Sequence, residues 1–303
     1  MIIVTGASGG FGRATVNRLL ESMPANQLIL TTRTPARLSD YAEKGANVRF
    51  ADYDNPESLP EAFSGGELML LISTSRVGSR VAQHRNAIVA AKAAGVRKVI
   101  YTSIIGAGNE ANPAIVTMDH RATETDLRNS GLAWNVLRDG QYAEALADLV
   151  APVAVATGEW YANEAEGRIA LVSRDDCVAS AAAILRGAGR DNTVYEITGP
   201  DLLSYREVAA MVSEISGRPV AYRVVTDDER FEQWDAIGVP RKASDDMSAS
   251  PIPWCSEDMV TFGRAIREGY MAGQSNAVEE LTGRPAVSMH DVLIKASGSW
   301  PPA

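Results

Sequence analysis

The chain has 303 residues, which is enough for one large domain or two smaller ones. Apolar residues make up 46% of it and charged residues 22%, the balance of an ordinary globular protein. The net charge of −9 argues against a nucleic-acid partner, and two cysteines in unrelated contexts argue against a metal site or a disulfide framework.

The N-terminus is typical of a strand, a glycine turn and a helix. Residues 1–4 are apolar, Gly6, Gly9 and Gly12 follow, and a helical pattern of apolar residues begins directly after them. In such a turn the backbone can approach a pyrophosphate, and the N–H groups that open the helix hold its negative charge. Because the motif stands in the strand-to-helix context that dinucleotide binding requires, we favour a binding turn over a turn without ligand.

Five more strands and four more helices are predicted before residue 138. The strands cover residues 27–32, 48–51, 68–72, 98–102 and 133–137. The helices begin at Pro35 and Pro56 or cover residues 79–94 and 119–129. Strands that alternate with helices predict an α/β fold with a Rossmann-type, doubly wound parallel sheet.

Polar residues follow five of the predicted strands. They are Thr5, Arg33, Asp52, Ser73 to Ser75, and Ser103. In open α/β sheets the ligand lies outside the carboxyl ends of the strands, so we expect these five strand ends to point at one site.

The second half of the chain is less regular and predicts a smaller α+β part. Its expected strands cover residues 152–161, 168–171, 194–197 and 220–225, and its first helices cover 174–186 and 204–216. We expect a dinucleotide-binding domain over residues 1–138, with a contribution from about 172–198, and a mainly substrate-binding part over 139–303. Residues 243–257 are polar and broken by proline, and they form either a lid or a plain surface loop.

The chain carries no sign of export or of a membrane span. The first strand begins at once, which leaves no room for a signal peptide, and no apolar run approaches the length of a span. With no disulfide framework, these features predict a cytoplasmic protein.

Short motifs along the first 225 residues carry a family resemblance. They are Thr5–Gly12 (TGASGGFG), Arg33, Ala51–Tyr53, Leu71–Ser75, Gln83–Asn86, Ala90–Val96, Tyr101–Ser103, His120–Glu124 and Leu137–Tyr142. In this order and spacing they resemble the NmrA-like group of atypical short-chain dehydrogenases/reductases. Within that group the chain is most similar to type 2 NAD(P)H:quinone oxidoreductases and triphenylmethane reductases.

The resemblance implies NADPH as the cofactor and implies which residues contact it. They are Gly6, Ser8, Gly9, Gly10, Phe11 and Gly12 in the turn, Arg33 after the second strand, Asp52 and Tyr53 beside the adenine, and Ser73, Thr74 and Ser75 beside the nicotinamide. His120 joins them, since it stands where the wider superfamily has a lysine that binds the nicotinamide ribose.

The end of the second strand also favours NADPH on chemical grounds. Enzymes that use NAD place Asp or Glu there to bind the ribose 2′-hydroxyl, whereas this chain has Arg33. A guanidinium can grip a 2′-phosphate through paired hydrogen bonds. The alternative is that Arg33 stacks on the adenine and is indifferent to the phosphate.

Two departures from the superfamily bear on the substrate. The tyrosine of Tyr-x-x-x-Lys is missing, because His120 stands at the lysine position and Val116 four residues earlier. A ketone needs its oxygen protonated when it accepts hydride, whereas a quinone, a cationic dye or another conjugated acceptor needs this help far less. Asp139 stands where quinone reductases more often have Asn, and it predicts a potential negative charge near the substrate.

Three residues are candidates for the catalytic site. Ser103 either donates a hydrogen bond to a substrate oxygen or merely ends its strand. His120 either binds the nicotinamide ribose or caps the helix at 119–129. Tyr142 either walls the acceptor pocket or belongs to the core.

The other titratable candidates are weaker. Glu124 lies one helical turn from His120 and either orients its imidazole or is a solvated helix charge. His84 and His290 are interpreted as structural or surface residues.

We therefore predict an NADPH-dependent reductase that passes hydride to a quinone-like or other conjugated electrophile. Two alternatives remain open: a non-catalytic NmrA-like sensor of NADP(H), and an imine or enone reductase of a biosynthetic or degradative pathway. The expected partner is a small-molecule electrophile, with no nucleic acid, membrane or metal, and a homodimer is an open possibility.

Overall fold

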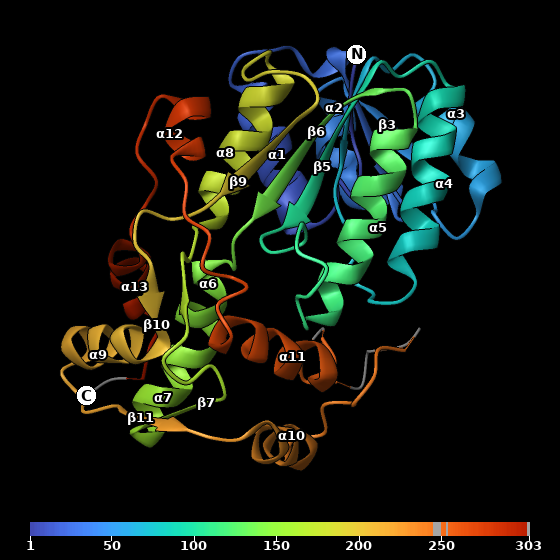
Figure 1. Ribbon diagram of the computed structural model, residues 1–303. Coiled ribbons are helices and arrows are strands. Elements are labelled where there is room, and N and C mark those ends of the chain that lie inside the picture. Colours follow the sequence, from blue (N-terminus) through green and yellow to red (C-terminus); the bar gives the residue numbers. More distant parts are fainter. Residues whose placement is uncertain (245–249, 253, 302–303) are drawn as a thin grey trace.

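A seven-stranded parallel sheet forms the centre of the computed structural model, which describes residues 1–244, 250–252 and 254–301. The strand order is β3-β2-β1-β4-β5-β6-β9 (Figure 1). These strands are β1 (Ile2–Val4), β2 (Leu28–Thr32), β3 (Asn47–Phe50), β4 (Leu68–Leu71), β5 (Lys98–Ile104), β6 (Ala133–Asp139) and β9 (Thr193–Ile197). The predicted Rossmann-type α/β class is confirmed, including a sheet strand near residues 194–197.

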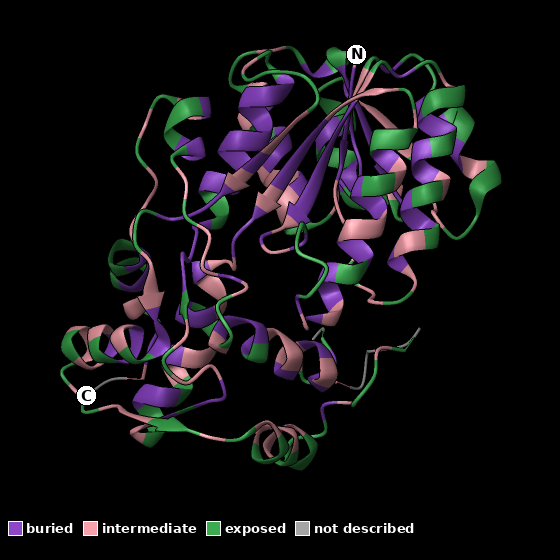
Figure 2. Ribbon diagram, viewed as in Figure 1, coloured by how far each residue is buried: buried purple, intermediate pink, exposed green. Residues whose placement is uncertain are grey.

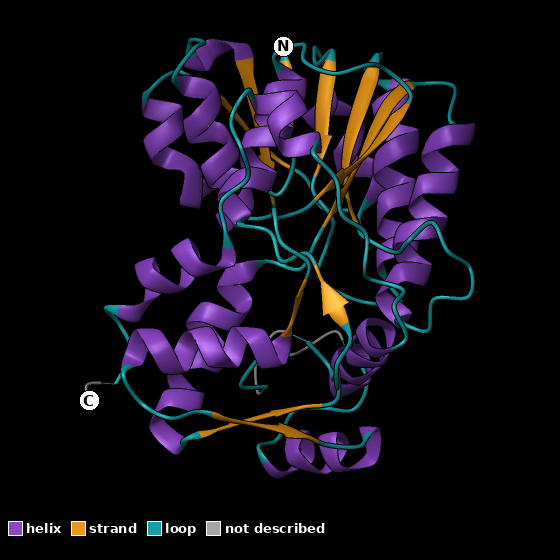
Figure 3. Cartoon of the chain, turned by 60° about the vertical axis from the view of Figure 1, so that its left-hand side comes forward, coloured by secondary structure: helices purple, strands orange, loops and turns teal. Residues whose placement is uncertain are grey.

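Helices cover both faces of this sheet (Figures 1 and 3). One face carries α1 (Gly10–Leu20), α2 (Ser39–Glu43), α8 (Arg174–Leu185) and α12 (Ala277–Thr282), and the other carries α3 (Leu59–Phe63), α4 (Arg80–Ala93) and α5 (Ile115–Asn129). Strands β1, β2, β4 and β5 are buried from both sides (Figure 2), which explains why β1 and β2 contain apolar runs instead of alternating residues.

The rest of the chain forms a smaller part below the carboxyl ends of the strands (Figure 1). Its helices are α6 (Ala143–Ala145), α7 (Ala151–Thr157), α9 (Tyr205–Ser216), α10 (Asp227–Ala236), α11 (Ser256–Arg267) and α13 (Met289–Ser297). Its strands are β7 (Glu159–Ala162), which pairs with β11 (Ala221–Val224), and β8 (Arg168–Ile169), which pairs with β10 (Leu203–Ser204). Trp160, Tyr205 and Trp300 are buried in its own core.

The prediction of a strand over residues 152–161 is wrong for most of that range. Residues Ala151–Thr157 form helix α7, and only the last part belongs to β7. Pro152 is tolerated because it lies in the first turn of the helix, and Ala151, Ala154 and Val155 pack inward with helical spacing. Gly158, with a φ of +77°, ends the helix.

Helix α5 begins at Ile115 and not at Asp119 as predicted. The N–H of Ile115 donates to Oγ1 of Thr261 in α11 at 3.3 Å. This partner comes from a distant part of the chain, so the helix start carries no local capping signal. Of the predicted lid at 243–257, residues 245–249 and 253 lie outside the described residues, and α11 begins at Ser256.

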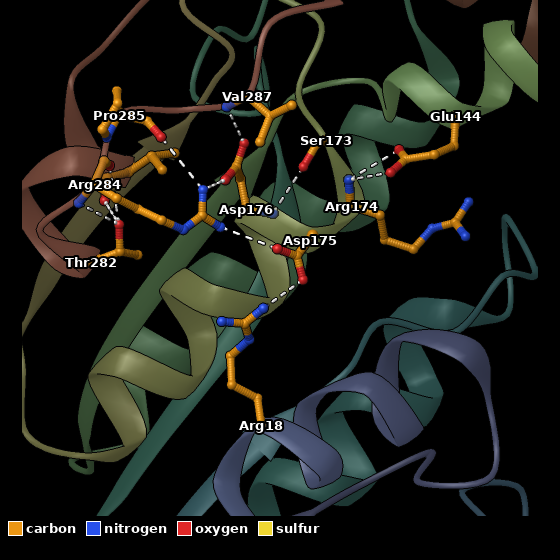
Figure 4. A network of polar contacts seen from close by, with 11 residues as sticks. Arg18, Glu144, Ser173, Arg174, Asp175, Asp176, Thr282, Arg284, Pro285 and Val287 are labelled. Carbon is orange, nitrogen blue, oxygen red and sulfur yellow. Dashed lines mark hydrogen bonds and ion pairs between the residues drawn. The ribbon is translucent and has the colours of Figure 1, made fainter. Parts of the chain in front are cut away.

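The last part of the chain returns to the sheet and is tied to it by ion pairs (Figure 4). Asp175, in the first turn of α8, accepts from Arg18 of α1 at 2.7 Å and from Arg284 at 3.2 Å. The neighbouring Asp176 is buried and accepts from the N–H of Val287 at 2.8 Å. These contacts fix the segment between α12 and α13 against α8. No helix in the described ranges has both the length and the apolar character needed to cross a bilayer.

Candidate functional site

The strand order reverses between β1 and β4, and this reversal locates the candidate site. In open α/β sheets a ligand binds in the crevice outside the carboxyl ends of the strands at such a point. Thr5 joins the two strand ends, because its hydroxyl donates to the carbonyl of Leu70 at 3.0 Å and accepts from the N–H of Ile72 at 3.0 Å. It is fully buried, so it braces the crevice and does not line it.

The glycines of the turn after β1 have different structural roles. Gly6 has a φ of +56°, which favours glycine. A Cβ on Gly12 would lie 2.5 Å from the carbonyl oxygen of Gly6, so this glycine lets α1 pack closely on the turn. Gly9 and Gly10 are exposed, and a Cβ on Gly10 would meet nothing within 4 Å. The N–H of Gly9 donates to the carbonyl of Gly6 at 2.9 Å, so the N–H groups open to a ligand begin at Gly10.

The start of α1 is suited to an anion. Gly9 is the N-cap and supplies no side-chain hydrogen bond, and no acidic residue stands in the first turn. The first N–H groups of the helix and the positive end of its dipole are therefore not compensated by the protein. Ser8 fixes the turn against β2, because its hydroxyl shares a hydrogen bond of 2.7 Å with that of Thr32. Phe11 is half-buried, and its packing against the core anchors the start of α1.

Arg33 is placed at the end of β2 with its side chain exposed. Within the described ranges no hydrogen bond or ion pair engages it. The neighbouring Arg13 differs, since it pairs with Asp40 at 3.1 Å and lies over the ring of Tyr41 at 5.2 Å; its hydrogen bond holds the pKa of the Asp40 carboxyl below its usual range. The residues that follow β2 directly contain no carboxylate, so the open glycine backbone and Arg33 together fit an NADPH.

The residues predicted beside the adenine lie in the turn after β3. The carboxylate of Asp52 accepts from the N–H of Asp54 at 3.1 Å, which shapes this turn. The ring of Tyr53 packs against the core beneath the sheet, and burial raises the pKa of its hydroxyl above the ordinary range. Contact of either side chain with an adenine stays a prediction.

The loop after β4, predicted beside the nicotinamide, is held from two sides. The N–H of Ser73 donates to the hydroxyl of Thr102, near the carboxyl end of β5, at 2.9 Å. Thr74 is bonded to α4, and Ser75 is exposed. The loop thus keeps a defined shape at the carboxyl edge of the sheet.

Ser103 lies near the carboxyl end of β5, and its hydroxyl proton points at a buried carboxylate. Its hydroxyl donates to Oε1 of Glu124 at 2.7 Å, and the same carboxylate accepts from Arg138 at 2.7 and 2.9 Å and from Arg128 at 2.9 Å. Glu124 is fully buried, and although burial raises its pKa, the hydrogen bonds lower it overall. Because this carboxylate can only accept, the geometry favours the strand-end role of Ser103 over donation to a substrate.

His120 is buried inside α5 with a partner that the sequence did not suggest. Its Nδ1 lies 2.7 Å from the hydroxyl of Tyr101, so Glu124, bonded elsewhere, does not orient it. Since α5 begins at Ile115, His120 is not a helix cap either. Burial, aided by the charge of Arg80, lowers its pKa well below the usual range, so the ring is neutral. Its contact with a nicotinamide ribose stays a prediction.

The half-buried Tyr142 and the buried Asp139 form a pair on the α1 and α8 side of the sheet. The hydroxyl of Tyr142 donates to Asp139 at 3.4 Å, and its ring packs against the core while Arg174 lies over it at 5.4 Å. Asp139 is 4% exposed, and burial raises its pKa to about 8. The raised pKa disfavours the predicted negative charge near pH 7, and contact of Asp139 with a substrate stays a prediction. Tyr142 fits the core alternative, and its contact with an acceptor stays a prediction.

Sequence reasoning missed the polar face of α4. Arg80, Gln83 and His84 are buried and bind the loop after β4. Their spacing of i, i+3 and i+4 in a predicted helix was the available signal. His84 is confirmed as a structural residue, and His290 is exposed.

Comparison with known proteins gives consistent matches along the whole chain. Residues 6–186 match a family model described as NAD(P)H-binding. The chain is 33% identical to quinone oxidoreductase 2 of Escherichia coli, with 95% of this chain and 96% of that protein covered. A crystal structure of the NADPH-dependent quinone oxidoreductase of E. coli with NADPH superposes with a TM-score of 0.88 at 31% identity, over 99% of both chains. The triphenylmethane reductase of Citrobacter sp. with NADP(H) gives 0.87 at 28% identity, over 98% of this chain and 100% of that one.

Proposed function

The chain belongs to the NAD(P)H-binding family, and from this premise we propose that it is an NADPH-dependent reductase of quinone-like or other conjugated electrophiles. The cofactor is supported by the open turn at Gly9 and Gly10 and by Arg33. The reaction class is supported by the full-length similarity to an NADPH-dependent quinone oxidoreductase and to a triphenylmethane reductase.

One observation carries the choice of acceptor: neither Ser103 nor His120 is placed as an acid for the substrate. Val116 stands at the position of the superfamily's acid, the hydroxyl of Ser103 donates to a buried carboxylate, and His120 is held neutral. A conjugated acceptor delocalises the electron pair that it receives, so its transition state needs less protonation than that of a simple ketone.

The bound NADPH would supply the hydride, and the chain would bind, orient and exclude water. The N–H groups at Gly10 and Phe11, at the start of α1, would hold the pyrophosphate, and Arg33 would pair with the 2′-phosphate. Residues 73–75 and His120 would border the nicotinamide half. We further propose that residues 1–138, with about 172–198, form the cofactor domain and that most of 139–303 forms the substrate-binding part.

The test is oxidation of NADPH, followed by its absorbance, against quinones, cationic dyes, enones and imines. We expect quinones or dyes to be turned over. Tight binding of NADPH without turnover of any acceptor would instead support the redox sensor, and turnover of enones or imines alone would support the third alternative. Both cysteines are free, which suits the proposed cytoplasmic location, while a homodimer and a lid at 243–257 remain predictions.

A further inference from the structure

Three polar side chains of α4 are buried on the face that meets the loop after β4. Arg80, Gln83 and His84 are 5%, 7% and 0% exposed. Their spacing places them on one side of the helix. Burying such groups costs free energy unless each one finds a hydrogen-bond partner, and the partners of all three converge on a single residue, Thr74.

Every polar group of Thr74 is bonded to this face of α4. Its N–H donates to Nε2 of His84 at 3.1 Å, and its hydroxyl donates to Oε1 of Gln83 at 2.8 Å. Its carbonyl accepts from Nε of Arg80 at 2.6 Å. Gln83 also donates to both carboxylate oxygens of Asp54 at 3.0 Å. One helix face therefore joins the loop after β4 to the turn after β3.

The hydrogen bonds around His84 determine which ring nitrogen carries the proton. The hydroxyl of Thr123 donates to the carbonyl of Asp119 at 3.0 Å, so it can only accept from Nδ1 of His84, which lies 3.0 Å away. A backbone N–H can only donate, so Nε2 must accept from Thr74. His84 is thus the neutral Nδ1–H tautomer, and burial agrees by lowering its pKa to about 3.

We propose that Arg80, Gln83 and His84 are positioning residues for the nicotinamide half of the cofactor site and act through Thr74. The proposal rests on the proposed function, since the loop at Thr74 must border the nicotinamide. With all three bonds in place the loop is ordered before NADPH arrives. When a bond is lost, binding must order the loop, and that cost lowers the affinity.

The decisive variant is Thr74→Val, which keeps the shape of the side chain but removes its bond to Gln83. Two ligands separate the two halves of the site: NADPH, and adenosine 2′,5′-bisphosphate, which lacks the nicotinamide. A neutral hydrogen bond contributes about 0.5–1.5 kcal/mol, so the Kd for NADPH should rise about 2- to 13-fold. The Kd for the bisphosphate should not change, and Thr74→Ser should recover the lost NADPH affinity.

The matched control is Arg85→Ala on the exposed face of α4, where Arg85 pairs with Asp126 at 2.9 Å. It should leave the affinity for both ligands at the wild-type value. A wild-type protein that fails to bind NADPH would contradict the proposed function. If the wild type binds NADPH, equal affinity in Thr74→Val, or an equal loss for both ligands, would overturn the positioning role.

A second measurement does not depend on any variant. Nitrogen NMR of the His84 ring should show a protonated Nδ1 and a bare Nε2 from pH 5 to pH 8, with a shift of the Nε2 signal when NADPH binds but not when the bisphosphate binds. A protonated Nε2 would exclude the bond to Thr74 and overturn the inference.

Discussion

Asp139→Asn tests whether a carboxyl at the end of β6 is held protonated by burial. Asp139 is 4% exposed, one of its oxygens is buried without a hydrogen bond, and its pKa is raised to about 8. In the unfolded chain an aspartate titrates near 3.9. Folding therefore takes up one proton at this residue at every pH between about 4 and 8.

The sign and size of the effect follow from this proton uptake. The contribution of Asp139 to stability is fully present below pH 4 and is lost as the pH rises to about 8, because the raised pKa favours the protonated, folded form. One proton changes the free energy of unfolding by about 1.4 kcal/mol per pH unit, so the wild type should lose about 3 kcal/mol at Asp139 between pH 5 and pH 7. Asn does not titrate and keeps the shape, so its variant should escape this loss.

The assay is urea unfolding of the wild type and of Asp139→Asn at several values between pH 5 and pH 8. The difference in unfolding free energy, variant minus wild type, should grow by about 1.4 kcal/mol per pH unit and level off above pH 8. The control is Asp201→Asn, which removes an exposed carboxyl and should follow the wild type. A constant difference between wild type and Asp139→Asn across this range would refute the reasoning.

Three further predictions concern the cofactor. Arg33→Ala should lower the preference for NADPH over NADH in kcat/KM by roughly 10- to 150-fold, because a hydrogen bond to a charged group contributes about 1.5–3 kcal/mol; equal use of both cofactors by the wild type would contradict this. Gly9→Val should fold but not bind NADPH in a fluorescence titration, whereas Gly12→Ala should lower the melting temperature, since its Cβ would lie 2.5 Å from a carbonyl oxygen. His120→Ala should raise the KM for NADPH and change kcat less than about 10-fold; a loss of 10²–10⁴-fold in kcat alone would identify a general acid.

The sheet could be predicted from the sequence because its signals are local. Buried parallel strands are short apolar runs, and each ends in a turn that the residues mark, as at Gly6 and at Asp52. Where a partner comes from far along the chain, local signals fail. The start of α5 at Ile115 depends on Thr261, and the apolar pattern of residues 151–157 suits a helix as well as a strand.

The candidate site, like the fold, can be predicted from the sequence only where its signals are local. The open backbone at Gly10 and the exposed Arg33 follow from the motif and its spacing. The directions in which hydroxyl groups donate their protons cannot be predicted in this way, because they depend on contacts between distant parts of the chain. The sequence does not show that Ser103 donates to Glu124, which lies 21 residues further along the chain, and it predicts a charge at Asp139 because burial has no local signal.

The directions in which the hydroxyl groups of the site donate their protons bear on what kind of reductase the fold supports. In a reductase that protonates its substrate, at least one acidic hydrogen must point into the crevice. Here the hydroxyl of Ser103 points at Glu124, and that of Thr74 points at Gln83. These bonds hold the crevice in one shape, and they leave neither of these two hydroxyl groups free to donate a proton to a substrate. A site of this kind selects its acceptor by the position in which the acceptor meets the cofactor. Substitutions at the residues that position its loops should therefore change the affinity for the cofactor more than they change the pH dependence of the rate.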